Sequence, residues 1–255
     1  MYYRQIEPPP DLTPWVECAW FLETALAPEG QLIVPDGRRE LIFHFAARPL
    51  CAGLQQAGTL ITSNLNQALE LALTGTMKVF GVRLQPFASE TGLAELEPRL
   101  ESLYQQLGNA RTEMEKLGLG WKALRYWTTP LALPDAAVAE SIRLIEAARG
   151  IGPTGTFMPS GLAERQWQRR FRQATGLSPK AFARVTRFQY LIARYEANDF
   201  HSWAELALDT GFQDQSHLVN DFRAFCGQSP EAYFQSGRGM TEFYRDGFLQ
   251  DPTAR

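Results

Sequence analysis

The chain has 255 residues, of which 45% are hydrophobic and 21% charged, and its formal net charge is −3. These values are ordinary for a globular protein of one or two domains. The sequence contains no run of about 18 apolar residues, the length that a membrane-spanning helix needs. The N-terminus lacks the apolar core of a signal peptide, and three cysteines in unrelated contexts do not suggest a disulfide framework. We therefore expect a cytoplasmic protein.

The first 95 residues or so predict mostly β-strands. Runs rich in β-branched and aromatic residues occur at 31–34, 40–45 and 77–84, and turn residues such as Pro35-Asp36-Gly37 bound them. Residues 12–21 fit either a short helix or an edge strand. This composition suits a small β-barrel or sandwich.

Helical spacing begins at residue 97 and continues to residue 127. Apolar residues form two stripes, separated at Gly108-Asn109: Leu100, Leu103, Tyr104 and Leu107, then Met114, Leu117, Trp121 and Leu124. We expect a helical pair and a role for its stripes in dimerisation, so that residues 1–130 would form a sensor or dimerisation domain. Pro130 and Pro134 mark a linker.

Everything after the linker predicts helices, which makes the fold class α+β. Expected helices run from Asp135 to about 149, over 163–175, from Pro179 to about 198, over 202–210 and 214–226, and after Ser229-Pro230. Residues 150–159 are rich in glycine and proline and weakly patterned. These helices define a second domain at 135–238, followed by a tail at 239–255.

One pattern occurs twice in this helical region. Residues 171–182 return as residues 222–233, and each copy contains the end of a helix, a glycine stop (Gly176 or Gly227) and a Ser-Pro start for the next helix. Two units are too few for a solenoid. The pair therefore indicates one kind of surface presented twice.

Charge is distributed unevenly over the two copies. Between residues 160 and 195, Glu164 is the single acid among eight cations: Arg165, Arg169, Arg170, Arg172, Lys180, Arg184, Arg187 and Arg194. Between residues 196 and 238, two cations stand against seven acids. A cationic stretch of this kind is typical of a phosphate-binding surface, with a solvated helix face as the alternative.

The helix before each glycine has an apolar and a polar face. Inward stripes are Trp167, Phe171 and Ala174 in the first, and Leu218, Phe222 and Phe225 in the second. Ala207 and Gly211 fit the helix crossing and turn of a helix-turn-helix. The outward residues have the side chains that read base edges in a major groove: Arg165, Gln168, Arg169 and Arg172, then Gln215, Ser216, Val219 and Asn220.

Residues 162–179 and 204–230 together resemble the DNA-binding domain of AraC/XylS-type transcriptional regulators in motif order and spacing. The resemblance implies two helix-turn-helix units joined by the long helix, each inserting one helix into successive major grooves. Matched position by position, it implies base contacts from Arg165, Gln168, Arg169, Gln215, Ser216 and Asn220, with His217 as a further candidate. We also expect phosphate contacts from Arg172, Lys180 and His217. The chain departs from the family at Asn220, where arginine is frequent, and at 152–159, where the first helix of the first unit is degenerate.

Pro35-Asp36-Gly37 and residues 80–86 resemble a sensor type associated with AraC-type domains. This resemblance implies a cupin-like β-domain followed by helices, which binds a small molecule or mediates dimerisation in some members. No pocket residue can be transferred from it.

The sequence gives little support for a metal site or an enzyme active site. His44, Cys18 and Cys51 share the N-terminal domain, but without metal-ligand spacing we expect a core histidine and two buried thiols. Phosphate loops and nucleophile elbows are absent. We therefore expect no catalytic residue, cofactor or metal, and no enzyme.

The predicted function is sequence-specific regulation of transcription through double-stranded DNA. A small-molecule effector, RNA polymerase and a second copy of the chain are further candidate partners. The alternative is a small-molecule-binding or enzymatic β-domain whose helical half binds DNA only weakly. The two differ in the salt dependence of DNA binding.

Overall fold

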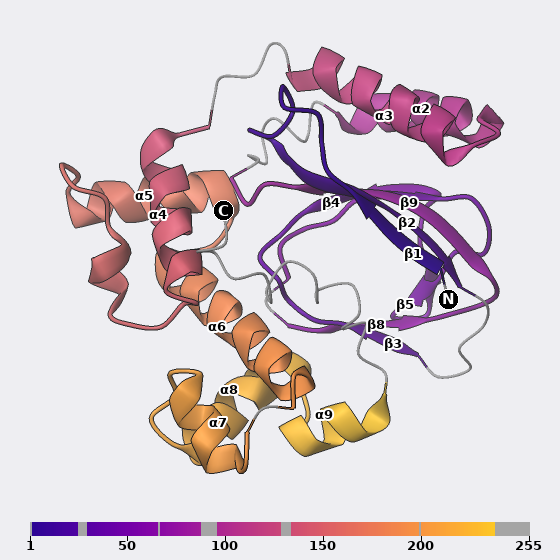
Figure 1. Cartoon of the computed structure of the whole chain (residues 1–255). Helices are drawn as coiled ribbons and strands as arrows, with labels where there is room; N and C mark the ends of the chain where they lie inside the picture. Colours follow the sequence, from indigo (N-terminus) through magenta and orange to yellow (C-terminus); the bar gives the residue numbers. More distant parts are fainter. Residues whose placement is uncertain are drawn as a thin grey trace.

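The computed structural model describes residues 2–24, 30–65, 67–87, 96–128, 134–198 and 200–237, with β-strands in the first part of the chain and helices in the second (Figure 1). One antiparallel sheet has the order β1 (Tyr2–Ile6), β2 (Val16–Thr24), β9 (Met77–Leu84), β4 (Glu40–His44) and β7 (Thr59–Ile61). A second sheet has the order β3 (Gln31–Ile33), β8 (Leu69–Ala72), β5 (Leu50–Cys51) and β6 (Leu54–Gln55). The α+β class is confirmed, with two sheets that do not close into a barrel.

Strand β2 resolves the alternatives left open for residues 12–21. It lies between β1 and β9 rather than at an edge. Its side chains alternate: Ala19 and Phe21 face one hydrophobic cluster, whereas Trp20 and Leu22 face another. Because both faces of the strand are covered, its sequence is an apolar run without polar alternation, and this obscured its position in the sheet.

Helices α2 (Glu97–Asn109) and α3 (Glu113–Thr128) cover one face of the five-stranded sheet (Figure 1). Their apolar residues are buried in one core with Phe21 and Phe80. The members from the predicted stripes are Leu100, Leu103, Leu107, Leu117, Trp121 and Leu124. The helical pair is thus confirmed. Its stripes pack on the sheet except for Met114, which is 67% exposed, and dimerisation through these helices stays a prediction.

The helical part contains α4 (Ala136–Ala147), α5 (Glu164–Thr175), α6 (Pro179–Glu196), α7 (Trp203–Asp209), α8 (Gln215–Cys226) and α9 (Pro230–Ser236). The predicted start signals act as caps: Ser178 Oγ accepts from the Ala181 amide, and Asp214 accepts from that of His217. Gly176 and Gly227 end α5 and α8 at φ 76° and 70°, a region that favours glycine.

The weakly patterned segment 150–159 contains only a short 3₁₀ helix, η1 (Thr154–Phe157). Ser141 of α4 connects this segment to α5. Its hydroxyl donates to the carbonyl of Phe157 at 2.8 Å and accepts from Trp167 Nε1 at 3.0 Å. Ser141 is fully buried, so this bond pair links α4, η1 and α5 in the segment where the first helix of the unit was predicted to be degenerate.

The Pro35-Asp36-Gly37 motif joins the two parts of the chain. Gln189 of α6 donates a hydrogen bond to the Pro35 carbonyl. Gly37 has a φ of 73°, and a Cβ there would lie 2.9 Å from the Phe182 ring of α6. Arg38 pairs with Glu146 of α4 at 2.7 Å. The motif is therefore a docking segment for the helices as well as a turn.

Candidate nucleic-acid interface and internal cavity

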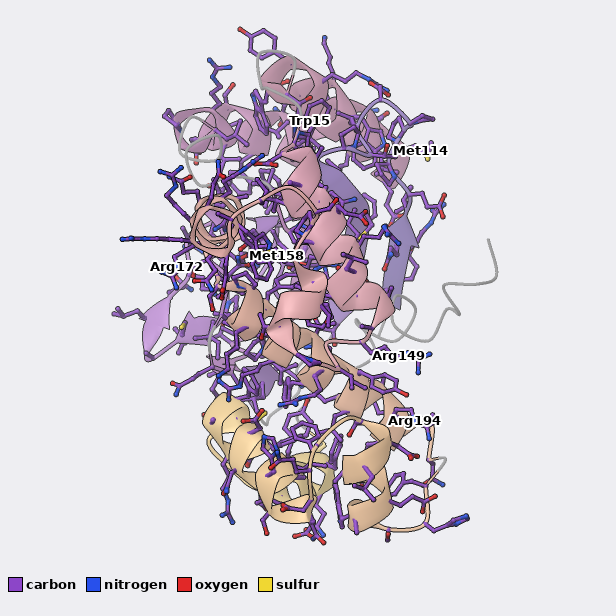
Figure 2. All side chains as sticks on the ribbon, turned by 90° about the vertical axis from the view of Figure 1, so that its left-hand side faces the viewer. Trp15, Met114, Arg149, Met158, Arg172 and Arg194 are labelled. Carbon is purple, nitrogen blue, oxygen red and sulfur yellow. The ribbon has the colours of Figure 1, made fainter. Side chains whose placement is uncertain are left out.

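Helix α5 presents the first predicted recognition surface. Trp167 and Phe171 are buried on its inner side, with exposed fractions of 1% and 0%. Arg165, Gln168 and Arg169 are all exposed, so the side chains predicted to face DNA lie on the outer side. Figure 2 shows Arg172, from the last turn, pointing away from the body of the molecule.

Four cations of the charged stretch are bound to acids far away in the sequence. Arg170 pairs with Asp135 at 2.6 Å, Arg184 and Arg187 pair with Asp221 at 2.8 and 2.9 Å, and Arg194 pairs with Asp209 at 3.4 Å. The other four, Arg165, Arg169, Arg172 and Lys180, make no ion pair with any residue that the structure describes and are all exposed. The structure thus divides the stretch into internal pairs and an exposed cationic patch, a name we keep for these four residues.

Helix α8 presents the second predicted surface. Leu218, Phe222 and Phe225 are buried beneath it, and Gln215, Ser216 and Asn220 are exposed. His217 is half-buried, with its ring edge-on to Phe212 at 5.3 Å between centroids. The His217 ring therefore packs against the turn before α8 through Phe212.

Asp221 connects α8 to the long helix α6, since it accepts hydrogen bonds from both Arg184 and Arg187. Burial alone would raise the pKa of the Asp221 carboxyl, but the hydrogen bonds and charges of the two arginines outweigh burial and lower it. This carboxylate therefore bridges two helices.

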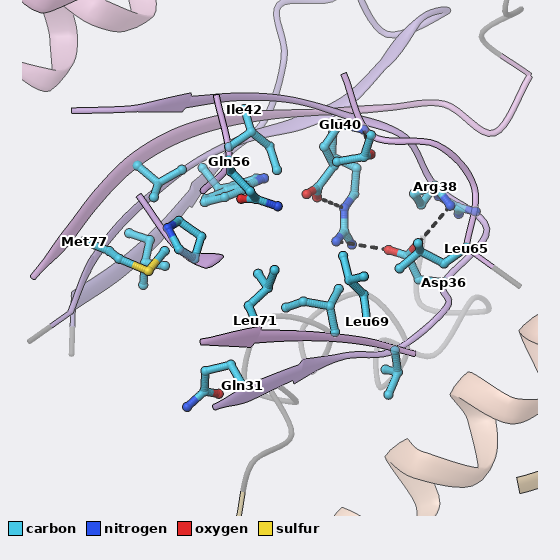
Figure 3. A pocket seen from close by; sticks show the side chains of 18 of the residues that line it. Gln31, Asp36, Arg38, Glu40, Ile42, Gln56, Leu65, Leu69, Leu71 and Met77 are labelled. Carbon is cyan, nitrogen blue, oxygen red and sulfur yellow. Dashed lines mark hydrogen bonds and ion pairs between the residues drawn. The ribbon is translucent and has the colours of Figure 1, made fainter. Parts of the chain in front are cut away.

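A cavity of about 770 Å³ lies between the two sheets. Its wall includes Trp20 and Val79 from the five-stranded sheet and Leu69 and Leu71 from β8. Figure 3 shows Asp36, Arg38 and Glu40 toward one end of this cavity, and Met77 and Gln56 toward the other. A volume of this size suits a drug-sized ligand.

Residues of the helical part complete the wall of the cavity. They come from the end of α6, from α9 and from the glycine directly after α9: Tyr195, Glu196, Tyr233, Phe234 and Gly237. Sequence reasoning missed this site, because strand patterning shows which residues face inward but not that a space remains between the sheets.

The expected absence of a metal cluster concerns His44, Cys18 and Cys51. Within the described ranges, no group of three or more histidine, cysteine or acidic residues is arranged to hold a metal ion. Cys18 is buried, and burial raises the pKa of its thiol to about 12. Cys51 is half-buried, which corrects the expectation of two buried thiols.

Known protein families match the β-rich part and the helical part of the chain separately. Residues 4–95 match a domain of unknown function (DUF6597), and residues 160–236 match a helix-turn-helix domain. No curated protein sequence matches the chain. None of the described helices is long and apolar enough to span a membrane.

Solved structures similar to the chain include ToxT from Vibrio cholerae. ToxT from strain O395 has 10% identity and a TM-score of 0.45, with 89% of this chain and 98% of ToxT covered. ToxT bound to (E)-4-(8-methylnaphthalen-1-yl)but-3-enoic acid has 9% identity and a TM-score of 0.46, with 84% and 98% covered. ToxT bound to an unsaturated fatty acid has 9% identity and a TM-score of 0.44, with 84% and 94% covered. Identities of 9–10% and TM-scores below 0.5 carry no information about the function of this chain.

The duplicated helical units and the helix-turn-helix match define a DNA-binding protein that regulates transcription. Its helix-turn-helix domain is of the AraC type and follows a β-rich domain of unknown function.

Proposed function

We propose that the chain inserts α5 and α8 into successive major grooves of its operator. Arg165, Gln168 and Arg169 then read bases in one groove, while Gln215, Ser216 and Asn220 read the next. Arg172, Lys180 and His217 contact phosphates. In this proposal residues 1–130 form the sensing domain, 135–238 the DNA-binding domain and 239–255 a tail outside the described residues.

The observation that carries this proposal is the exposed cationic patch. Each of its four residues lies on α5 or in the first turn of α6, whereas the other cations of the same stretch are bound to acids. Unpaired surface cations do little for folding stability, but they release counterions when they neutralise phosphates. Since α8 has no comparable patch, α5 supplies most of the affinity and α8 adjusts specificity.

A small molecule in the cavity regulates this DNA binding. The segment between β7 and β8 includes the wall residues Thr62, Ser63 and Leu65. From the same segment, Asn64 Nδ2 donates to the carbonyl of Thr175 at the end of α5. A shift of this segment on ligand binding would therefore reach a recognition helix directly, which gives the cavity a physical route to the DNA face.

The first test is selection of genomic fragments with the full chain, beginning with the region next to the encoding gene. Affinity for the selected site is then measured against salt concentration by fluorescence anisotropy. About six phosphate contacts predict a log–log slope of roughly −5, with scrambled DNA bound at least about 1,000-fold more weakly. A shallow slope and equal binding to both DNAs would instead support the weakly binding helical adaptor.

A further inference from the structure

The charged groups of the cavity wall indicate which ligands it does not favour. Arg83 pairs with Asp36 at 3.1 Å and with Glu40 at 2.9 Å. Arg38 is held by two carboxylates, those of Glu17 and Glu146. Each arginine of the wall therefore already has two acidic partners.

An anionic head group would have to displace one of these carboxylates or lie beside it. Burial raises the pKa of both Asp36 and Glu40, so this end of the cavity already penalises negative charge. A further carboxylate would add like-charge repulsion and its own desolvation. A cationic head group gains little in return, since Asp36 and Glu40 are occupied by Arg83.

Two neutral polar groups on the wall are incompletely hydrogen-bonded within the described residues. The Tyr233 hydroxyl is buried without a hydrogen bond there, and the His44 ring is buried beside Gln56, another wall residue and its neighbouring polar group. The exposed fractions of Tyr233 and His44 are 2% and 3%. Buried polar groups are nearly always hydrogen-bonded, so wall residues with unused hydrogen-bonding capacity favour a ligand with matching groups.

Both groups stay neutral near pH 7. Burial lowers the pKa of the His44 imidazole, and burial raises the pKa of the Tyr233 phenol. The phenol therefore offers a hydroxyl donor, and the imidazole offers one donor and one acceptor nitrogen. Neutral oxygens such as hydroxyls and carbonyls complement these groups without adding charge.

We infer that the cavity binds a neutral, mostly apolar small molecule that carries hydroxyl or carbonyl oxygen, with Tyr233 and His44 as its hydrogen-bonding partners. This inference rests on the proposed role of the cavity as a ligand site. The apolar wall, which includes Leu22, Ile42 and Leu71, contacts the rest of the molecule.

Three probes with the same ten-carbon chain separate the ligand classes: 1-decanol, decanoate and decylammonium. Their binding to the full chain is measured at pH 7 by calorimetry, below the concentration at which each probe aggregates. We expect 1-decanol to bind at least about 10-fold more tightly than either ion. Equal or tighter binding of decanoate or decylammonium, or no binding of any probe, would overturn the inferred class.

Variants show whether the binding occurs in this cavity. Tyr233→Phe removes a hydroxyl that has no partner within the described part of the chain, so the fold should be retained while 1-decanol binds about 2- to 10-fold more weakly. Leu71→Trp fills the cavity and should abolish binding, whereas Leu54→Trp, at a position 76% exposed, should not change it. Unchanged affinity in both Tyr233→Phe and Leu71→Trp would place the probe elsewhere and overturn the inference.

Operator binding is measured in parallel for every probe. If decanoate binds and changes operator affinity, the regulated DNA-binding function stands and the inferred ligand class fails. If no fragment is selected and the salt slope is shallow, the proposed function fails whatever the probes do.

Discussion

The backbone amide of Ala68 donates a hydrogen bond to the carbonyl of Phe225 at 2.6 Å. Phe225 lies in the last turn of α8, and Ala68 directly precedes β8. A few residues earlier, Asn64 contacts the corresponding end of α5 through the Thr175 carbonyl. One segment of the β-rich part therefore contacts both α5 and α8 at their C-terminal ends.

Asn64→Ala should loosen this contact. The substitution removes the donor to the Thr175 carbonyl, which still accepts from Arg39 Nη2 at 3.3 Å. We expect the free energy of unfolding to fall by about 0.5–1.5 kcal/mol in urea denaturation. Gln67→Ala, at an exposed position of the same segment, is the control and should change it by less than about 0.5 kcal/mol. Equal losses in both variants would show that the contact contributes nothing specific.

Arg169→Ala should weaken binding to the selected operator by about 1–3 kcal/mol if Arg169 reads a base. Scrambled DNA should lose much less, because a base contact adds little to nonspecific binding. Arg143→Ala removes the same charge from α4, where Arg143 pairs with Glu140 on an exposed face, and should leave both affinities nearly unchanged. An identical loss on operator and scrambled DNA would reassign Arg169 to a phosphate contact.

Arg172→Ala and Lys180→Ala should act differently, since both residues are proposed to contact phosphates. Each substitution should reduce the magnitude of the salt slope by about one and weaken operator and scrambled DNA alike. Anisotropy titrations at several salt concentrations give both quantities. A slope identical to that of the parent chain would remove the residue from the interface.

Asp221→Asn should destabilise the helical part. The side chains of Asp221 and Arg187 are 14% and 15% exposed, so the substitution leaves a largely buried cation without its partner, at a cost of about 3 kcal/mol. Asp209→Asn is the control: its pair with Arg194 is more exposed and should contribute about 0–1 kcal/mol.

The effect of Asp221→Asn should also depend on pH. Because the folded state lowers the pKa of Asp221, its contribution to stability is present above the unfolded pKa and is lost as the pH falls through the folded value. The difference between the parent chain and Asp221→Asn should therefore be largest near neutral pH and shrink in acid. A difference that is the same in acid and at neutral pH would rule out the ionised carboxylate as its cause.

Two glycine substitutions should change the free energy of unfolding in opposite directions. A Cβ on Gly81 would lie 2.1 Å from the Trp20 ring, so Gly81→Ala must displace that ring and should cost about 1–3 kcal/mol. Gly118 is an exposed position within α3 with nothing within 4 Å of its Cβ, and Gly118→Ala should stabilise the chain by about 0.5–1 kcal/mol. Thermal unfolding of both variants tests the pair, and stabilisation by Gly81→Ala would contradict the packing of Trp20.

Sequence reasoning succeeded where the signal is local. Caps such as Ser178 and Asp214, the glycine stops and the apolar stripes of α5 and α8 depend on residues within a few turns of one another, and each was predicted in place. The exposed position of the predicted base-reading residues follows from the same periodicity. Their contacts with DNA remain predictions.

Features that depend on distant partners could not be predicted in this way. Nothing near Arg170 or Arg184 in the sequence shows that the partners are Asp135 and Asp221. The stripes of α2 and α3 indicated a buried face but not that a sheet of the same chain covers it. The cavity depends on the separation of two sheets, a quantity that strand patterns do not contain.

Because α9 supplies Tyr233 and Phe234 to the cavity wall, the β-rich part cannot be separated from the helical part without changing the cavity. A chimera that joins residues 1–130 to the DNA-binding domain of another protein would lack one side of the cavity wall, whatever linker it used. Moving the proposed ligand response into another regulator therefore requires the end of α6 and all of α9 along with the β-sheets.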